Sequence, residues 1–197
     1  LECHIKTSLI KSKYGYTIDG GALKYINVEN FNAASLDVKI HGRSIHPGDA
    51  KDKMINSINV GYDFHSCLPS YLRPEHTEGR VGFYHLCNIQ GNEEYTEMNY
   101  IVREHSRCKL ENMLSIARHA ARRINDIYGH EVIELDIKNQ YNNMKEIIDR
   151  NPNIISRIEK AYQKLNIVYE FEPIRGGTDG AQLTFMGYPT PNIATGD

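Results

Sequence analysis

The segment at residues 175–181 combines an arginine, three glycines and two cap-forming residues in a pattern that could bind an anion. It follows a predicted strand and opens a predicted short helix over residues 181–186. Glycines let a ligand approach backbone N–H groups, a helix N-terminus favours negative charge, and a guanidinium binds a carboxylate in a two-pronged manner. The same spacing also fits a capped turn, because Thr and Asp are favoured N-caps. Both interpretations use Arg175, Gly176, Gly177, Thr178 and Asp179.

Three other residues have types and positions that could take part in chemistry. Asp19 ends a predicted strand before Gly20-Gly21, where its carboxylate could ligate a metal, although an Asp-Gly turn is the simpler explanation. His46 lies in a short loop and could donate a hydrogen bond to a developing oxyanion, or could simply face solvent. Arg103 ends another predicted strand, where it is either an anion clamp or a solvated arginine.

The remaining histidines and the cysteines show no spacing typical of a metal site. No two of the nine histidines form an H-x-x-x-H pair. The four cysteines have neither a C-x-x-C spacing nor the density of a secreted disulfide scaffold. We therefore predict reduced thiols in a cytoplasm and no zinc ribbon. The cysteines are Cys3, Cys67, Cys87 and Cys108.

Composition and charge narrow the class of protein. A chain of 197 residues with 40% hydrophobic content can bury a core. Its 23 Lys and Arg against 25 Asp and Glu give a net charge of -2, so no attraction to nucleic acid or anionic membrane is expected. No apolar run approaches the roughly 18 residues of a membrane helix, and no signal-peptide pattern opens the chain. We expect a cytoplasmic protein and, without an initiator Met, part of a longer chain.

The elements that must position these residues follow from hydrophobic periodicity. Residues 36–41 alternate as a strand, and a helix follows, with Met54, Ile55, Ile58 and Tyr62 predicted on its buried face. Two further strands are predicted at 81–89 and 95–102, joined by a hairpin turn that contains Gly91. A long helix at 109–128 and a strand at 133–138 complete the series.

This order of strand, helix, strand, strand, helix, strand predicts an α+β protein with a ferredoxin-like (βαββαβ) domain over residues 32–142. The flanks, residues 1–31 and 143–197, are expected to be two pieces of one partial α/β domain. They contain a strand and turn at 14–21, a helix at 153–165 and a strand at 168–174. The ferredoxin-like domain is thus predicted to be inserted into the flanking domain.

Taken together, these segments resemble the peptidase T family, tripeptide aminopeptidases among the aminoacylase-related co-catalytic zinc exopeptidases. The resemblance covers nearly the whole chain after about Tyr14. The motifs that carry it are YTIDGG (16–21), ENFNAAS (29–35), the His46-Pro47 loop with Ala50-Lys51, EHTEGRVGFYHL (75–86), PIRGGTDGAQLTFMG (173–187), TPN (190–192) and TG (195–196).

The resemblance implies roles for the candidate residues. Asp19 would be a ligand of one zinc in a two-metal centre that holds a bridging hydroxide. His46 would stabilise the tetrahedral intermediate in the partner subunit of a homodimer. Arg103 and Arg175 would grip the C-terminal carboxylate of a peptide substrate, and the loop at 176–179 would line its pocket. The inserted domain would form the dimer through an unpaired sheet edge and would act as a lid.

Departures from the family pattern qualify these expectations. The family's other metal ligands and its glutamate base belong outside residues 1–197, so we expect the parent to bind two zinc ions per subunit but not this chain alone. The parent would release the N-terminal residue of tripeptides by metal-assisted hydrolysis. An alternative is an inactive dimerisation and substrate-clamping module. A small-molecule-binding or RNA-binding ferredoxin-like protein rests on fold analogy alone.

Overall fold

The computed structural model describes residues 7–196 and divides into two compact units. The central unit is Ala33–Gln140. The flank unit contains the described residues up to Asn32 and from Tyr141 onward.

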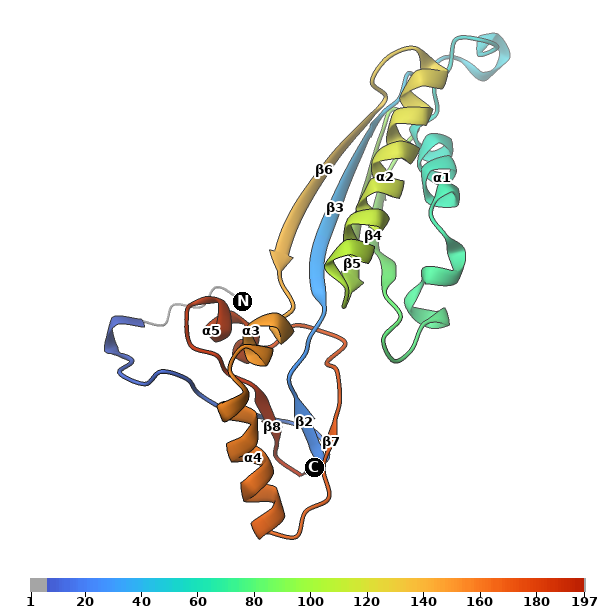
Figure 1. Cartoon of the computed structure of the whole chain (residues 1–197). Coiled ribbons are helices and arrows are strands. Elements are labelled where there is room, and N and C mark those ends of the chain that lie inside the picture. The colour runs from blue at the N-terminus through green and yellow to red at the C-terminus, as the bar shows by residue number, and fades with distance from the viewer. Residues whose placement is uncertain (1–6, 197) are drawn as a thin grey trace. The chain divides into compact units, whose positions relative to one another are not determined.

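The central unit has the ferredoxin-like fold that the order of sequence patterns predicts. Its four-stranded sheet has the order β4-β5-β3-β6, and β4 and β5 form an antiparallel hairpin. Both helices cover the same face of this sheet (Figure 1). The elements are β3 (Asn32–His41), α1 (Ser57–Cys67), β4 (Phe83–Gly91), β5 (Tyr95–Glu104), α2 (Arg107–Tyr128) and β6 (Ile133–Tyr141).

Helix α2 confirms the prediction of a long amphipathic helix. Ser106 caps its start, since the hydroxyl accepts a hydrogen bond from the backbone of Lys109 at 3.4 Å. Gly129 ends it in a left-handed conformation with φ 71°, which glycine adopts without strain. One apolar stripe faces the sheet and forms much of the core. Its buried residues are Leu110, Met113, Leu114, Ala117, Ala120, Ala121 and Ile124.

The predicted buried face of α1 is wrong. The side chain of Asn56 accepts hydrogen bonds from the backbones of Ile58 and Asn59, so the helix begins at Ser57, after Met54 and Ile55. The face that packs on the sheet is therefore offset from the predicted one. It contains Ser57, Val60, Gly61 and Phe64, whereas Ile58 is 46% and Tyr62 is 71% exposed.

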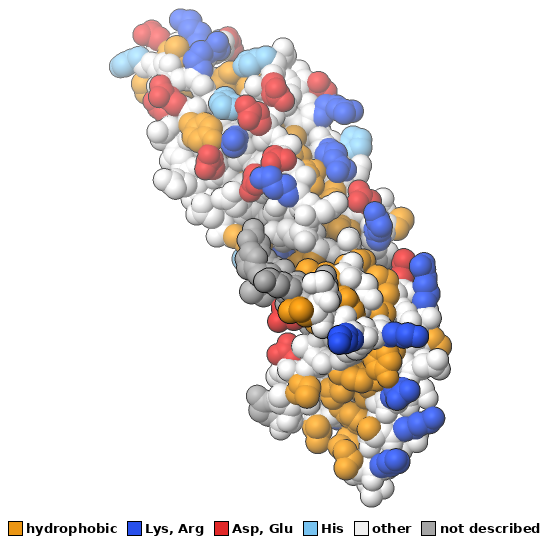
Figure 2. Space-filling model, turned by 90° about the vertical axis from the view of Figure 1, so that its left-hand side faces the viewer, with side chains coloured by type: hydrophobic (Ala, Val, Ile, Leu, Met, Phe, Trp, Pro, Cys, Tyr) orange, Lys and Arg blue, Asp and Glu red, His pale blue; other side chains and the backbone are white. Residues whose placement is uncertain are grey.

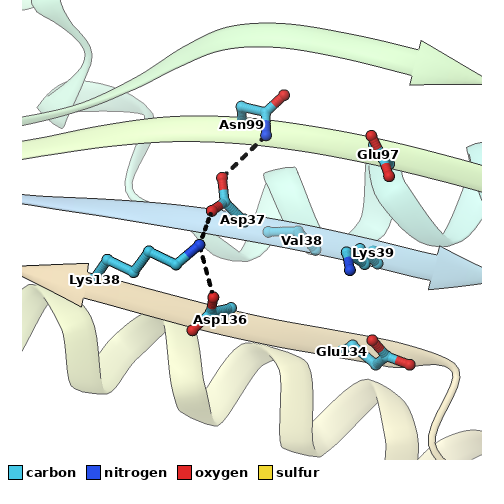
Figure 3. A pocket seen from close by; sticks show the side chains of 8 residues that line it. All are labelled: Asp37, Val38, Lys39, Glu97, Asn99, Glu134, Asp136 and Lys138. Atoms are coloured by element: carbon cyan, nitrogen blue, oxygen red, sulfur yellow. Dashed lines mark hydrogen bonds and ion pairs between the residues drawn. The ribbon is translucent and has the colours of Figure 1, made fainter.

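The opposite face of the central sheet is open and polar. Asn88 on β4 donates to Asn99 on β5 at 3.2 Å, and Asn99 donates to Asp37 on β3 at 3.0 Å. Lys138 on β6 then lies 3.1 Å from Asp37 and 3.0 Å from Asp136 (Figure 3). The hydrogen bond from Asn99 and the charge of Lys138 lower the pKa of Asp37. This cross-strand series spans all four strands.

The flank unit contains short strands and the remaining helices. Its sheet has the order β1-β8-β2-β7, in which β1 and β8 are parallel, β8 and β2 antiparallel, and β2 and β7 parallel. Helix α4 packs on this sheet through Ile158 and Tyr162, which contact Ile26. The elements are β1 (Thr17–Asp19), β2 (Tyr25–Asn27), α3 (Lys145–Asp149), α4 (Pro152–Lys164), β7 (Glu170–Phe171), α5 (Asp179–Phe185) and β8 (Asn192–Ala194).

None of the helices in the described range 7–196 is long and apolar enough to cross a membrane. Cys67, Cys87 and Cys108 are free thiols on the surface, whereas Cys3 lies outside the described residues.

Candidate functional site

Asp19 lies at the end of β1, where the sequence places it. Its side chain is exposed and accepts a hydrogen bond from the backbone N–H of Gly20 at 2.8 Å. Its backbone carbonyl accepts from Thr195 at 2.8 Å, so strand β8 fixes the position of this residue. The local geometry is that of an Asp-Gly turn with the second carboxylate oxygen available to a ligand.

The loop at residues 175–178 lies in the same unit as Asp19. The guanidinium of Arg175 lies over the ring of Phe31, 5.3 Å from its centroid. The backbone N–H of Phe31 also donates to the carbonyl of Gly176 at 3.3 Å, so the same residue holds both the side chain and the backbone of this loop. A cation over the face of an aromatic ring is attracted by the ring electrons, so Phe31 helps to hold the Arg175 guanidinium in this loop.

Thr178 and Asp179 begin helix α5. Thr178 is the N-cap, since its hydroxyl accepts from the backbone N–H of Gly180 at 3.2 Å, and Asp179 is the first helical residue. The same hydroxyl accepts from the side-chain amide of Asn192 at 2.6 Å. The capped turn that the spacing allowed is therefore present, and β8 supports it.

Gly180 packs against β8 without space for a side chain. A Cβ at this position would lie 2.4 Å from Oδ1 of Asn192 and 2.5 Å from the carbonyl of Thr190. Asn192 pairs with Thr17 on β1, two residues before Asp19. Strand β8 thus connects the 175–180 loop to the strand that carries Asp19.

His46 and Arg103 belong to the central unit. His46 is exposed, and its Nδ1 accepts a hydrogen bond from Gly48 at 3.2 Å at the start of a single 3-10 turn (Pro47–Asp49). Arg103 is half-buried near the end of β5 and donates to the carbonyls of Ala34 and Val102 at 3.2 and 3.0 Å. The structure thus distributes the candidate residues over both units.

The described residues do not form a metal centre of their own. No group of three or more His, Cys, Asp or Glu side chains within residues 7–196 is placed to hold a metal ion. A carboxylate such as Asp19 supplies one or two ligand atoms, whereas a bound zinc needs about four. The two-zinc site that the resemblance implies therefore does not fit the donor set that residues 7–196 bring together.

A buried amide network in the flank unit was not recognised from the sequence. Asn30, fully buried, donates from its side chain to the carbonyls of Phe31 and Asn142 and accepts from the backbone of Met144 at 2.9 Å. Asn143 donates to the buried carboxylate of Glu29 at 3.1 Å. The cluster of amides in residues 29–32 and 142–143 was its only sequence signal. Within the flank unit the network ties these two segments together.

Comparison with known proteins shows which family the chain belongs to. Residues 28–132 match the model of the peptidase dimerisation domain, a segment that includes β3, α1, β4, β5 and α2. The chain belongs to this family. The peptidase dimerisation domain match ends just before β6, the last strand of the central sheet.

Sequence relatives extend the similarity beyond the peptidase dimerisation domain. The chain is 48% identical over 181 residues to a Peptidase T of Clostridium acetobutylicum, covering 92% of this chain and 44% of the relative. It is also 48% identical to a Peptidase T of Caldanaerobacter subterraneus, covering 93% and 45%. The chain therefore spans less than half the length of these curated relatives.

Solved structures share the fold. A tripeptidase from Staphylococcus aureus has a TM-score of 0.82 at 16% identity, covering 98% of this chain and 51% of the other. The aminopeptidase PepT from Bacillus cereus has a TM-score of 0.75 at 19% identity, covering 97% and 51%. These likenesses agree with the ferredoxin-like lid fold predicted for the central unit.

Proposed function

We propose that the chain is the dimerisation and substrate-clamping part of a tripeptide aminopeptidase. The observation that carries this proposal is the peptidase dimerisation domain, continuous in one chain with a flank whose relatives are named Peptidase T. The parent would release the N-terminal residue of tripeptides by zinc-assisted hydrolysis. The unpaired thiols agree with a reducing cytoplasm as its compartment.

In this proposal the 175–179 loop binds the C-terminal carboxylate of the peptide. Arg175 supplies the guanidinium, which lies over the ring of Phe31, and Gly176 and Gly177 carry no side chain that would keep a ligand from the backbone. Thr178 and Asp179 fix the turn at the start of α5. Arg103 contributes a second guanidinium. These contacts orient the peptide and do not themselves break its bond.

Asp19 and His46 have proposed roles that require partners. Asp19 would contribute one ligand to a zinc pair in the parent, and because residues 7–196 bring no group of three or more ligand side chains together, they alone would hold zinc weakly. His46 acts across a homodimer on the partner's substrate, for which its exposed ring is suited. The chain alone is accordingly inactive, and residues 32–142 supply the dimer contact.

Binding of a tripeptide to the purified chain tests the clamp. Calorimetry or amide chemical shifts should detect a tripeptide with a free carboxylate and at least tenfold weaker binding of its C-terminal amide. Arg175→Ala should lose at least tenfold in affinity. The matched control is Arg157→Ala, because the guanidinium of Arg157 also lies over an aromatic ring of the flank unit. That ring belongs to Tyr14, and its centroid is 5.8 Å away. Equal binding of the acid and the amide would contradict the clamp.

Turnover and association test the remaining parts. The chain with added zinc should not hydrolyse tripeptides, and rates of about 1 per second or more, usual for enzymes, would contradict its proposed inactivity. Light scattering at micromolar concentration should give the mass of a dimer. A monomer would remove the basis for the role of His46.

A further inference from the structure

Helix α2 and the outermost strand β6 border a groove of about 500 Å³ on the central unit. The two elements run in opposite directions (Figure 1). Leu135 and Ile137 of β6 form an apolar floor, and both are half-buried because they also pack against the core. Arg118 and Arg122 line the groove from α2. On the side of the central unit where β6 lies, basic side chains are seen next to hydrophobic ones (Figure 2).

The two arginines of this groove are available to a ligand. Arg118 and Arg122 lie one turn apart on α2, and both are exposed. Neither has an ion-pair or hydrogen-bond partner among residues 7–196. Glu131 is the acidic residue among the lining side chains, so positive charge is in excess. Because a guanidinium binds a carboxylate through two parallel hydrogen bonds, the groove favours a carboxylate ligand.

The backbone of β6 turns alternately toward and away from its neighbour β3. The carbonyl of Val132, just before β6, accepts from His41 of β3 at 2.8 Å. The next residue, Ile133, turns the other way, since its N–H and C=O both bond to the side chain of Asn125 on α2, at 2.8 and 3.0 Å. Asn125 thus satisfies the start of the outer edge in the way that a paired strand would.

Beyond Ile133 the outer edge of β6 is open to a ligand. By the same alternation, the N–H and C=O groups of Leu135 and Ile137 point away from β3. The helix from Arg118 to Asn125 rises about 10 Å, and the strand from Ile133 to Ile137 about 13 Å. Because the helix and the strand run in opposite directions, the arginines that precede Asn125 lie alongside this open edge.

The charged side chains of β6 do not close the groove. They alternate with its floor residues and so lie on the open face of the sheet. There Lys138 lies 3.1 Å from Asp37 and 3.0 Å from Asp136 (Figure 3), and Glu134 lies 3.0 Å from His41. Each has a partner within the sheet, so a strand that pairs with β6 does not have to supply one.

We propose that this groove binds an extended acidic segment of a partner protein by strand addition to β6. The backbone of the segment pairs with Leu135 and Ile137, the mode by which other peptides extend a sheet. Every second side chain then points to the α2 side, where carboxylates meet Arg118 and Arg122. The segment is therefore acidic at alternate positions. The inference goes beyond the proposed peptidase function and uses none of its residues.

A synthetic peptide tests the charge preference of the groove. The probe is Ac-TETETET-NH2, which is acidic at every second position and has no charged ends. Calorimetry with the full chain should detect its binding. The counterpart Ac-TQTQTQT-NH2 should bind about tenfold more weakly, because glutamine cannot form charge-assisted hydrogen bonds with a guanidinium.

Two neighbouring arginines of α2 provide a variant and its control. Arg122→Ala should weaken binding of the acidic peptide about tenfold. Arg123→Ala should leave it unchanged, because Arg123 is equally exposed but does not line the groove. Circular dichroism should show both variants folded, since neither side chain belongs to the core.

Amide exchange distinguishes strand addition from simple attraction of an anion. When the acidic peptide binds, the N–H groups of Leu135 and Ile137 should exchange about tenfold more slowly. Slower exchange at these two residues, with binding that depends on Arg122 and not on Arg123, supports the inference. Equal weakening by the two arginine variants, binding without slower exchange at β6, or no binding at millimolar peptide overturns it.

Discussion

Asn192 donates a 2.6 Å hydrogen bond to the hydroxyl of Thr178, which in turn accepts from the backbone of Gly180. A residue of strand β8 therefore holds the cap of helix α5. Because Asn192 also pairs with Thr17 on β1, the loop proposed to bind the carboxylate and the strand that carries Asp19 share one support.

Loss of the Thr178 hydroxyl should destabilise the start of α5. Thr178→Ala removes the acceptor for Gly180 and Asn192 and should cost about 1 kcal/mol in the free energy of unfolding. Thr178→Ser keeps the acceptor and should retain most of the stability. Urea denaturation gives the free energies, and amide exchange of residues 180–182 shows whether the loss is local. Equal stability of the Ala and Ser variants would contradict the role of the cap.

A methyl group at Gly180 should disturb the contact with β8. Gly180→Ala places a Cβ against Asn192 and the backbone of Thr190, and overpacking of this kind costs about 1–3 kcal/mol. Gly176→Ala is the control in the same loop, because no heavy atom lies within 4 Å of its Cβ position. Thermal unfolding of the two variants should differ clearly, and an unchanged midpoint for Gly180→Ala would contradict the tight packing.

Removal of the Asn30 side chain should be costly. Asn30→Ala leaves the buried backbone N–H of Met144 and the carbonyls of Phe31 and Asn142 without their side-chain partner, for a loss of about 2 kcal/mol. Asn27→Ala removes a single, more exposed hydrogen bond to the carbonyl of Glu172, so it should lower the free energy of unfolding by a smaller amount. Chemical denaturation compares the two, and an equal loss would mean that burial of the network is unimportant.

Acid should weaken the central unit through His65. Its Nε2 lies 3.0 Å from Arg73, which can only donate, so its proton is on Nδ1 and donates to Tyr100 at 3.0 Å. Burial and then the charge of Arg73 lower the pKa of His65 below about 6.5, with Glu75 opposing. As the pH falls, His65 therefore takes up its proton more readily in the unfolded chain than in the folded one. The stability that is present above a pH of about 6.5 is lost as the pH falls from there through the folded pKa.

The measurement is the unfolding midpoint at pH 7.5 and 5.5. Between these two pH values the unfolding midpoint of the native chain should fall by roughly 2 °C more than that of the His65→Gln variant. The His119→Gln variant, which removes an exposed histidine of α2, should keep the native pH dependence. If the unfolding midpoint of His65→Gln fell with pH as much as that of the native chain, the acid sensitivity would come from a group other than His65.

Long periodic elements could be predicted from the sequence, and short ones could not. The apolar stripe of α2 determines that helix locally, and the hairpin turn lies directly after Gly91, where the side chain of Asn92 accepts from the backbones of Glu94 and Tyr95. Strands β2 and β8 have three residues each, too few to show a period, and their partners are distant in sequence, since Ile26 pairs with Ile193 and Asn27 with Asn192. The expected strand at 168–174 contains only β7 (Glu170–Phe171), with an isolated bridge from Ile174 to Asn30.

The candidate site likewise has some features that could be predicted from the sequence and others that could not. Residue types could indicate Thr178 as a cap, which the structure confirms, because capping depends on local chemistry. The role of Arg175 as an anion ligand stays a prediction. The support from Asn192 depends on a tertiary contact that no spacing reveals. The buried face of α1 was mispredicted because Asn56 was not recognised as the cap that delays the helix.

The series of polar side chains on the open central sheet has a consequence for sequence divergence. Asp37 meets Lys138, and Asn99 meets both Asp37 and Asn88, so each member has its partner on a neighbouring strand. Replacement of Asp37 leaves Lys138 with Asp136 of its own strand, and replacement of Lys138 leaves Asp37 without its cross-strand cation. Positions 37 and 138 should therefore vary together among relatives, with a swap of acid and base tolerated better than either single replacement.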